Sequence, residues 1–371
     1  MSNFTCTWKP ALKGALFAAL AGSACVVSAQ IATAPPVVTR PIIGTVTPDP
    51  NGWGEIGLVN EATYPFDATP SSALKRAPLG PTSKTLFQSP EGEPGSTLPV
   101  GQLIHMEYQP TWSMKEWPAG MPPHFHQFYE WGYTMRGDSI MPEPVSTEQL
   151  NGLNYRKTEG GWLTRPPYSL HSGSVLSGGE RNQLPYELII FEEGDGHIIT
   201  VGRDGKPGQV RTRDGGPLPP GIDGDYRNVK DFTRPWLINP RSEDWEPDRE
   251  VPGRFVKWLD DSLQGGFRSR LVKIPPGWTA PEGWTRTYFE HANVLRYMVW
   301  GDMKVWRFKD PQDVGKAFLV SRNYFIYQPP RAIWGYGSGP VTKDGAIWLE
   351  VTYAKGLKHG GGPIEAVKHL K

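Results

Sequence analysis

Cysteine is almost absent from this chain of 371 residues, which contains only Cys6 and Cys25. Both lie in an N-terminal segment where Lys9 and Lys13 precede the apolar run ALFAALAGSACVV. A basic start, a short apolar centre and small residues after it are typical of a secretory signal, with cleavage expected after Ala29. The mature chain would then have no thiol, which excludes disulfides and thiolate chemistry.

Long hydrophobic runs are also lacking. The run in this segment is shorter than the roughly 20 apolar residues that a membrane-spanning helix needs. A membrane anchor is therefore the weaker alternative, and so is a lipid on Cys25, because Gly22 rather than leucine stands three residues before it. We expect a signal peptide over residues 1–29 and a periplasmic or secreted protein that has no membrane contact after cleavage.

Neither sign of charge dominates, with 39 Lys and Arg against 38 Asp and Glu. This balance gives no electrostatic basis for binding nucleic acid or an anionic membrane surface. The sequence also lacks GxxxxGK[ST], and its GxGxxG match, GWGEIG at 52–57, follows a proline-containing stretch instead of an expected strand, so neither phosphate-binding signature of nucleotide-dependent enzymes is in place. Together with export, these absences argue against NAD(P)H, ATP or coenzyme A as a cosubstrate.

Glycine and proline are abundant instead, with 43 and 38 residues, and tryptophan reaches 15. Short apolar runs separated by glycine and proline predict an all-β fold with many short strands. The clearest expected strands are at 188–191 and 197–201. Residues 30–95 are rich in proline, threonine and serine and predict an extended N-terminal arm.

Two strand-rich blocks repeat the same landmarks. The tripeptide PTW at 110–112 is followed by Gly137, and PGW at 276–278 is followed by Gly301 at a nearly equal interval. Such a repeat predicts two similar β units in tandem. The expected segments are a signal peptide (1–29), an extended arm (30–95), a first domain (96–202), a linker (203–250) and a second domain (251–371).

Histidines gather in the stretch PPHFHQFYEWGYTMRGD, residues 122–138. Side chains two apart on a strand share a face, so His124, His126, Phe128 and Glu130 would point the same way. Two imidazoles and a carboxylate at this spacing can converge on one metal ion, and His171 is the candidate for a fourth ligand. A glycine at 137 also predicts a hairpin turn with positive φ after this strand.

These motifs resemble those of the cupin family. Residues 124–137 (HFHQFYEWGYTMRG) are similar to the first cupin motif, and residues 160–171 (GGWLTRPPYSLH) are similar to the second. Tyr168 replaces a common glycine and Val175 stands where asparagine is common, but neither is a ligand position. The resemblance implies a bicupin, two tandem jelly-roll β-barrels, whose first barrel binds a metal through His124, His126, Glu130 and His171.

The second unit does not repeat the ligands. Counting back from Gly301 places Tyr288, Glu290 and Val294 at the ligand positions, and Trp334 replaces the last histidine. Only a glutamate among these binds metal well. We therefore expect a degenerate second cupin, similar to the ChrR-like branch of the family, which packs a core or forms the face of a homodimer.

The ligand set fits one divalent metal ion but does not specify which. Fe(II) is the first choice, and Mn(II), Ni(II), Cu(II) and Zn(II) also fit. Three aromatic residues, Phe128, Tyr133 and Tyr168, predict a pocket for an apolar or aromatic oxygenated substrate. Glu130 has a second predicted role as the catalytic base that takes a proton from this substrate.

Three functions remain open from the sequence. The favoured one is an exported metal-dependent oxidoreductase, a dioxygenase that combines a phenolic or enolisable carbonyl compound with O₂. The second is a redox-neutral lyase or isomerase that uses the metal as a Lewis acid. The third is a protein that binds a metal or small ligand without catalysis, and fold alone cannot choose among the three.

Overall fold

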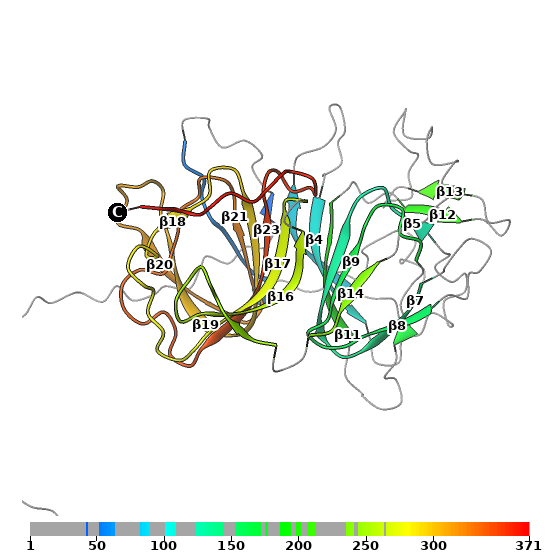
Figure 1. Ribbon diagram of the computed structural model, residues 1–371, viewed down its shortest axis with the longest axis horizontal. Helices are drawn as coiled ribbons and strands as arrows, with labels where there is room; N and C mark the ends of the chain where they lie inside the picture. The colour runs from blue at the N-terminus through cyan, green and yellow to red at the C-terminus, as the bar shows by residue number, and fades with distance from the viewer. Residues whose placement is uncertain are drawn as a thin grey trace, which may run out of the picture. The chain divides into compact units, whose positions relative to one another are not determined.

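A computed structural model describes most of the chain after residue 100 and parts of the chain before it (Figure 1). The described residues are 42–43, 52–63, 82–89, 101–108, 124–143, 153–171, 175–176, 186–193, 198–201, 207–211, 235–240, 244–262 and 265–370. They form strands and one 3₁₀ turn, η1 (Glu61–Thr63), which confirms the predicted all-β class. No helix among them could span a membrane. The predicted signal peptide lies outside the described residues.

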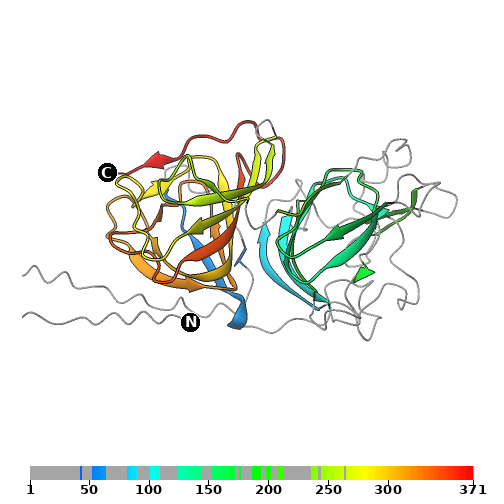
Figure 2. The same cartoon turned by 60° about the horizontal axis from the view of Figure 1, so that its bottom comes forward.

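The strands fall into two groups. The first group comprises β1 and β3 to β14 and forms one large and two small sheets (Figure 2). The seven-stranded sheet has the order β1 (Ile42–Ile43), β3 (Thr82–Ser89), β4 (Gly101–Tyr108), β11 (Tyr186–Glu192), β6 (Glu130–Arg136), β9 (Trp162–Arg165) and β14 (Trp236–Ile238). The small sheets are β10 (Val175–Leu176), β7 (Ser139–Glu143) and β8 (Leu153–Lys157), and β13 (Pro207–Arg211), β12 (Ile198–Val201) and β5 (His124–Phe125).

The second group is an eleven-stranded sheet. Its main path runs through β15 (Glu246–Pro247), β16 (Phe255–Ser262), β17 (Phe267–Ile274), β23 (Ala346–Tyr353), β19 (Asn293–Arg307), β22 (Trp334–Gly335), β18 (Thr287–Tyr288) and β24 (Lys368–His369). Three further strands pair off this path: β2 (Gly57–Asn60), β20 (Lys316–Ser321) and β21 (Tyr324–Gln328).

Several local predictions can be compared with these strands. β11 and β12 confirm the strands expected at 188–191 and 197–201. Gly137 has the expected positive φ, 73°. The expected hairpin is wrong, however, because β7 pairs with β8 and β10 instead of folding back on β6. A turn with positive φ reverses the chain locally, but the partner of the following strand is chosen by packing.

The segments expected as arm and linker supply strands to both groups where they are described. From 30–95, β3 joins the first sheet beside β4, and β2 joins the second sheet beside β21. From 203–250, β14 extends the first sheet beside β9.

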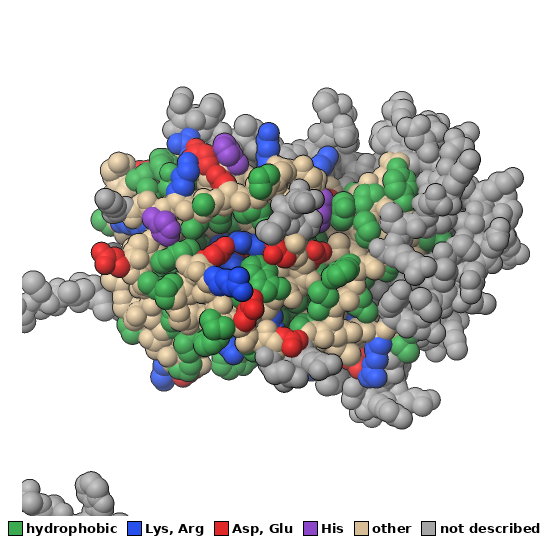
Figure 3. Space-filling model, in the orientation of Figure 1, with side chains coloured by type: hydrophobic (Ala, Val, Ile, Leu, Met, Phe, Trp, Pro, Cys, Tyr) green, Lys and Arg blue, Asp and Glu red, His purple; other side chains and the backbone are tan. Residues whose placement is uncertain are grey.

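Aromatic side chains fill the core. One buried cluster includes Trp131 and Phe191 from the first group with Phe267 and Tyr353 from the second. The indole nitrogen of Trp131 donates a hydrogen bond of 2.7 Å to the hydroxyl of Tyr353, which satisfies both buried polar groups. On the face in Figure 3, basic and acidic side chains are interspersed.

Candidate metal centre

The backbone brings His124 and His171 together, although 46 residues separate them in the sequence. Each donates its backbone N–H to the carbonyl of the other, at 2.8 and 2.9 Å. Two residues on, the carbonyl of His126 accepts a bond of 2.7 Å from the backbone N–H of Tyr168. These bonds join the two predicted motifs as neighbouring strands.

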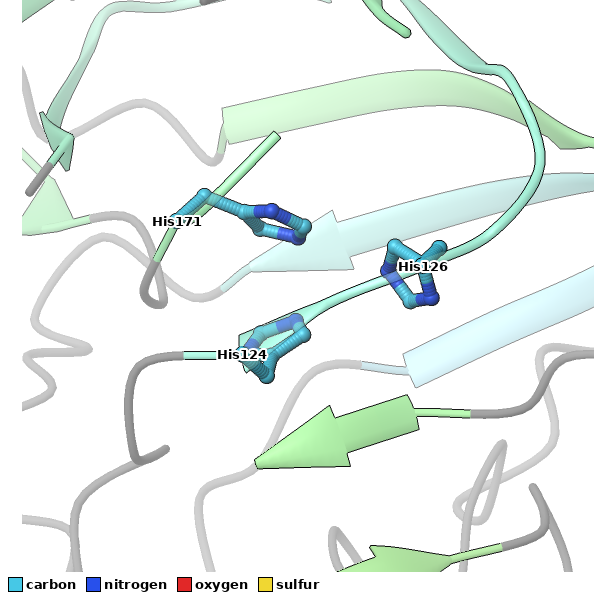
Figure 4. Close-up of side chains that lie close together, drawn as sticks. All are labelled: His124, His126 and His171. Atoms are coloured by element: carbon cyan, nitrogen blue, oxygen red, sulfur yellow. The ribbon is translucent and has the colours of Figure 1, made fainter. Parts of the chain in front are cut away.

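Three imidazoles gather around one space (Figure 4). His124, His126 and His171 each offer a ring nitrogen, and these nitrogens lie within 4.8 Å of one another. The three side chains are 3–4% exposed. Nδ1 of His171 donates to the carbonyl of Ser169 at 2.8 Å, which leaves the lone pair of Nε2 available to a metal. Buried, converging and correctly oriented imidazoles fit a divalent transition metal ion.

The electrostatics keep His171 in the form that binds metal. Its pKa is lowered well below 6.5 by burial and by the nearby charges of Arg165, His124 and His126, which outweigh its bond to Ser169. His171 is therefore neutral at pH 7, so a metal ion need not displace a proton from it.

This pKa shift predicts how the metal-free protein responds to acid. Below pH 6.5 His171 takes up a proton in the unfolded chain but not in the folded one, so stability falls as pH decreases toward the lowered pKa. The free energy of unfolding should lose up to about 1.4 kcal/mol per pH unit from this group. Urea unfolding of wild type and His171→Asn between pH 8 and 5, with chelator present, measures the difference; the exposed His291→Asn is the control. Identical pH slopes in wild type and His171→Asn would contradict the prediction.

Glu130 lies beside the histidines and pairs with Arg165. The two residues face each other across β6 and β9, and Nη1 of Arg165 donates to Oε1 of Glu130. The other oxygen, Oε2, is 3.6 Å from Nε2 of His126, close enough for both atoms to bind one ion. Glu130 as the fourth ligand remains a prediction.

The Glu130 carboxyl is ionised despite being 4% exposed. Burial by itself raises its pKa, but the charges of Arg165, His126 and His124 and the bond from Arg165 lower it more. Arg165 could not be recognised as a site residue from the sequence. It directly precedes the motif proline at 166, but only the strand register places it opposite Glu130.

The predicted pocket aromatics separate into two sets. The ring centroid of Phe128 lies 4.7 Å from that of His126. The hydroxyl of Tyr168 accepts a hydrogen bond of 3.1 Å from the side-chain amide of Gln127, the residue next to Phe128. Tyr133 is instead buried in the core with Trp131. It lies three residues after Glu130, and an odd separation on a strand points a side chain to the opposite face. The structure therefore does not bring Tyr133 to the histidines.

Tyr168 adopts a left-handed conformation with φ of 65°, at the position where the cupin motif commonly has glycine. Side chains with a Cβ are strained there by about 1–2 kcal/mol. Tyr168→Gly should therefore be more stable than Tyr168→Ala by about 1 kcal/mol, since both lose the ring and only alanine keeps the strain. Urea midpoints of the two variants test this. A higher urea midpoint for Tyr168→Ala than for Tyr168→Gly, which is the usual order at negative φ, would contradict the prediction.

Among its described residues, the second group of strands holds no equivalent ligand set. Thr287 lies opposite Trp334 in the strand pairing, as His124 lies opposite His171. The position equivalent to His124 is therefore Thr287, one residue before Tyr288, which the spacing of the sequence repeat had predicted. Glu290, counted as the one possible ligand, pairs with Lys368 and Arg331. Among the described residues, the three histidines of the first group are the cluster that could hold a metal ion.

Comparisons with known proteins give no family model that matches this chain and no similar curated protein. Among solved structures, the Lactobacillus farciminis oxalate decarboxylase in a formate complex is similar with 15% identity and a TM-score of 0.48, over 88% of this chain and 90% of that one. A variant of the Bacillus subtilis oxalate decarboxylase has 12% identity and a TM-score of 0.47, over 80% and 76% of the two chains.

Because these TM-scores are below 0.5, the fold assignment depends on this chain's own strands and histidines. An all-β fold in two strand groups, with both motifs paired and three histidines converging, supports the cupin resemblance. The centre has the geometry of a three-histidine metal site, and membership of the cupin family stays a prediction from the motifs. The ChrR-like character of the second unit stays a prediction.

Proposed function

We propose that this protein is a metal-dependent enzyme, a dioxygenase that acts on a phenolic or enolisable carbonyl compound at the three-histidine centre. The observation that carries the proposal is the position of an ionised carboxylate, Glu130, next to three buried imidazoles that can hold a metal. The compartment we propose, from the sequence, is the periplasm or the exterior.

His124, His126 and His171 would hold the ion, with Glu130 as the predicted fourth ligand. When bound, the metal supplies a Lewis acid for an oxygen of the substrate and, in the case of Fe(II), the electrons for reaction with O₂. Fe(II) is our first choice among the metals that fit this donor set.

The chain's own residues provide the proton chemistry. Glu130 accepts a proton from the hydroxyl or α-carbon of the substrate, because its pKa is lowered and it is ionised at neutral pH. Arg165 holds this carboxylate through Oε1 and leaves Oε2 on the side of His126. Phe128, beside His126, provides an apolar contact that favours an aromatic or apolar substrate body.

A redox-neutral lyase or isomerase is the second candidate. It is favoured by the same ionised carboxylate, since proton transfer by Glu130 needs no oxidant. A non-catalytic binding protein is the third, and it predicts metal binding with no turnover.

Metal content and oxygen dependence test these functions together. Wild type and His126→Ala should be loaded with Fe(II) and supplied with a panel of phenols and 1,3-diketones, with and without O₂. We expect one iron per wild-type chain and product that forms with O₂ uptake. His126→Ala should lose metal affinity by at least the 10- to 100-fold that removal of an outer-shell partner causes. The exposed His291→Ala should behave as wild type.

Other results select other functions. Turnover under strict anaerobiosis would overturn the dioxygenase and favour the lyase or isomerase. Bound metal without turnover of any compound would favour the binding protein. Equal metal content in wild type and His126→Ala would contradict the centre itself.

A further inference from the structure

The second strand group encloses a cavity of about 290 Å³. Thr287 and Trp334 line it, and this pair corresponds in the strand register to His124 and His171. The cavity thus takes the place in the second unit that the metal centre has in the first. Since no metal-ligating cluster among the described residues lies there, any ligand must be held by other chemistry.

Buried arginines provide that chemistry. Arg254, Arg270 and Arg296 line the cavity and are 3–5% exposed. Glu350 accepts bonds from Arg270 at 2.7 Å and from Arg296 at 2.8 Å, and Asp248 accepts one from Arg254 at 2.9 Å. Three cations against two carboxylates leave one excess positive charge in the buried part, where salt screens little.

The remaining charged groups of the lining are less buried. Arg268 pairs with Glu250, whose side chain is 42% exposed, and Glu250 also lies 3.1 Å from Arg270. Glu365 accepts the backbone N–H groups of residues 291 and 292. Together these groups add one cation and two carboxylates, but water screens the exposed carboxylate of Glu250 more than the buried cluster.

Two buried donors of the cavity lining have no acceptor among the described residues. Nη1 of Arg270 and Nε1 of Trp334 make no hydrogen bond to any residue that the structure describes. Oδ2 of Asp248 is 4.0 Å from Nη1, beyond hydrogen-bond distance. The guanidinium of Arg296 lies 4.1 Å over the Trp334 ring and restrains that side chain. Unsatisfied buried donors are costly, so each such donor in a cavity requires an acceptor to explain it.

The guanidinium of Arg270 is a permanent charge. Burial lowers its pKa, but Glu350, Glu250 and Asp248 together raise it above the usual value. The wall also includes Trp284, Phe289 and Tyr336, which are flat and largely apolar. A volume near the lower end of the range for ligand pockets suits a molecule with one ring.

We propose that this cavity binds a small carboxylate with an aromatic body, whose oxygens accept bonds from Arg270 and Trp334. The proposal goes beyond the metal-centre reaction and does not depend on it. The carboxylate adds the negative charge that the buried arginines lack, and its ring lies against the aromatic wall.

Calorimetric titration of the full chain with sodium benzoate tests the proposal. The titration is made in the metal-free His126→Ala background, so that benzoate cannot bind to a metal in the first unit. We expect one saturable site per chain, with benzamide and acetate at least tenfold weaker. Trp334→Phe keeps an aromatic side chain but removes the N–H together with the five-membered ring of the indole, and should weaken benzoate about tenfold, as the loss of a hydrogen bond to a charged group predicts. The matched control is Trp300→Phe, at a tryptophan that is 51% exposed.

Arg270→Lys is the second variant, because lysine keeps the charge but cannot make the paired donor geometry. It should weaken benzoate as well, and circular dichroism shows that each variant is folded. Absence of benzoate binding in the folded parent overturns the proposal. So does binding that is unchanged in both Trp334→Phe and Arg270→Lys, or equal binding of benzoate and benzamide. If acetate binds as tightly as benzoate, the proposal that the ligand has an aromatic ring is refuted.

Discussion

Replacing Glu130 by glutamine is expected to lower kcat by about 10²- to 10⁴-fold, the range for loss of a general base. Glutamine has the same shape and its amide oxygen still accepts from Arg165, so the geometry of the site should be kept, although the buried Arg165 cation loses its countercharge and the variant should be less stable than wild type. What it loses is the ability to take a proton. The measurements are kcat on the best substrate of the panel and the metal content of the same sample.

Metal content distinguishes the two predicted roles of Glu130. Unchanged metal with lost activity supports the role as a base. Loss of metal together with activity shows a ligand, which the 3.6 Å separation from Nε2 of His126 also permits. The exposed Glu159→Gln in the same strand group is the control and should keep both. Full activity in Glu130→Gln would refute the base.

Replacing Arg165 by methionine should lower the free energy of unfolding by about 3–5 kcal/mol. The variant leaves the buried carboxylate of Glu130 without its partner, and an uncompensated buried charge is strongly destabilising. The comparison is urea unfolding of the metal-free proteins at pH 7, analysed for midpoint and slope.

An exposed pair provides the matched control. Arg156 donates to Asp138 at 2.6 Å, but its side chain is 66% exposed. Arg156→Met should cost less than about 1 kcal/mol, because water screens that pair. The double variant Arg165→Met/Glu130→Gln should recover much of the loss, since no buried charge remains unpaired. Equal losses in Arg165→Met and Arg156→Met would mean that Glu130 is not held by Arg165.

The centre could be predicted from sequence where the chemistry is local. His124 and His126 are two residues apart, so the alternation of a strand places both on one face wherever the strand lies. His171 followed from a motif whose spacing fixes the partner strand. The all-β class followed from glycine and proline between short apolar runs, since these residues end strands regardless of the tertiary context.

Tertiary structure decided which side chains meet across strands. A shift of one residue in the register of a strand moves every side chain to the opposite face of the sheet. The spacing of residues in the sequence does not reveal this register. The register therefore put Thr287 rather than Tyr288 opposite Trp334 and placed Arg165 opposite Glu130. The arginine cavity depends on such pairings as well, because it is built from strands far apart in the sequence. The sequence determined the three histidines that come together and the class of fold, whereas only packing decided the charges around them, because Coulomb energy depends on distances that strand register sets.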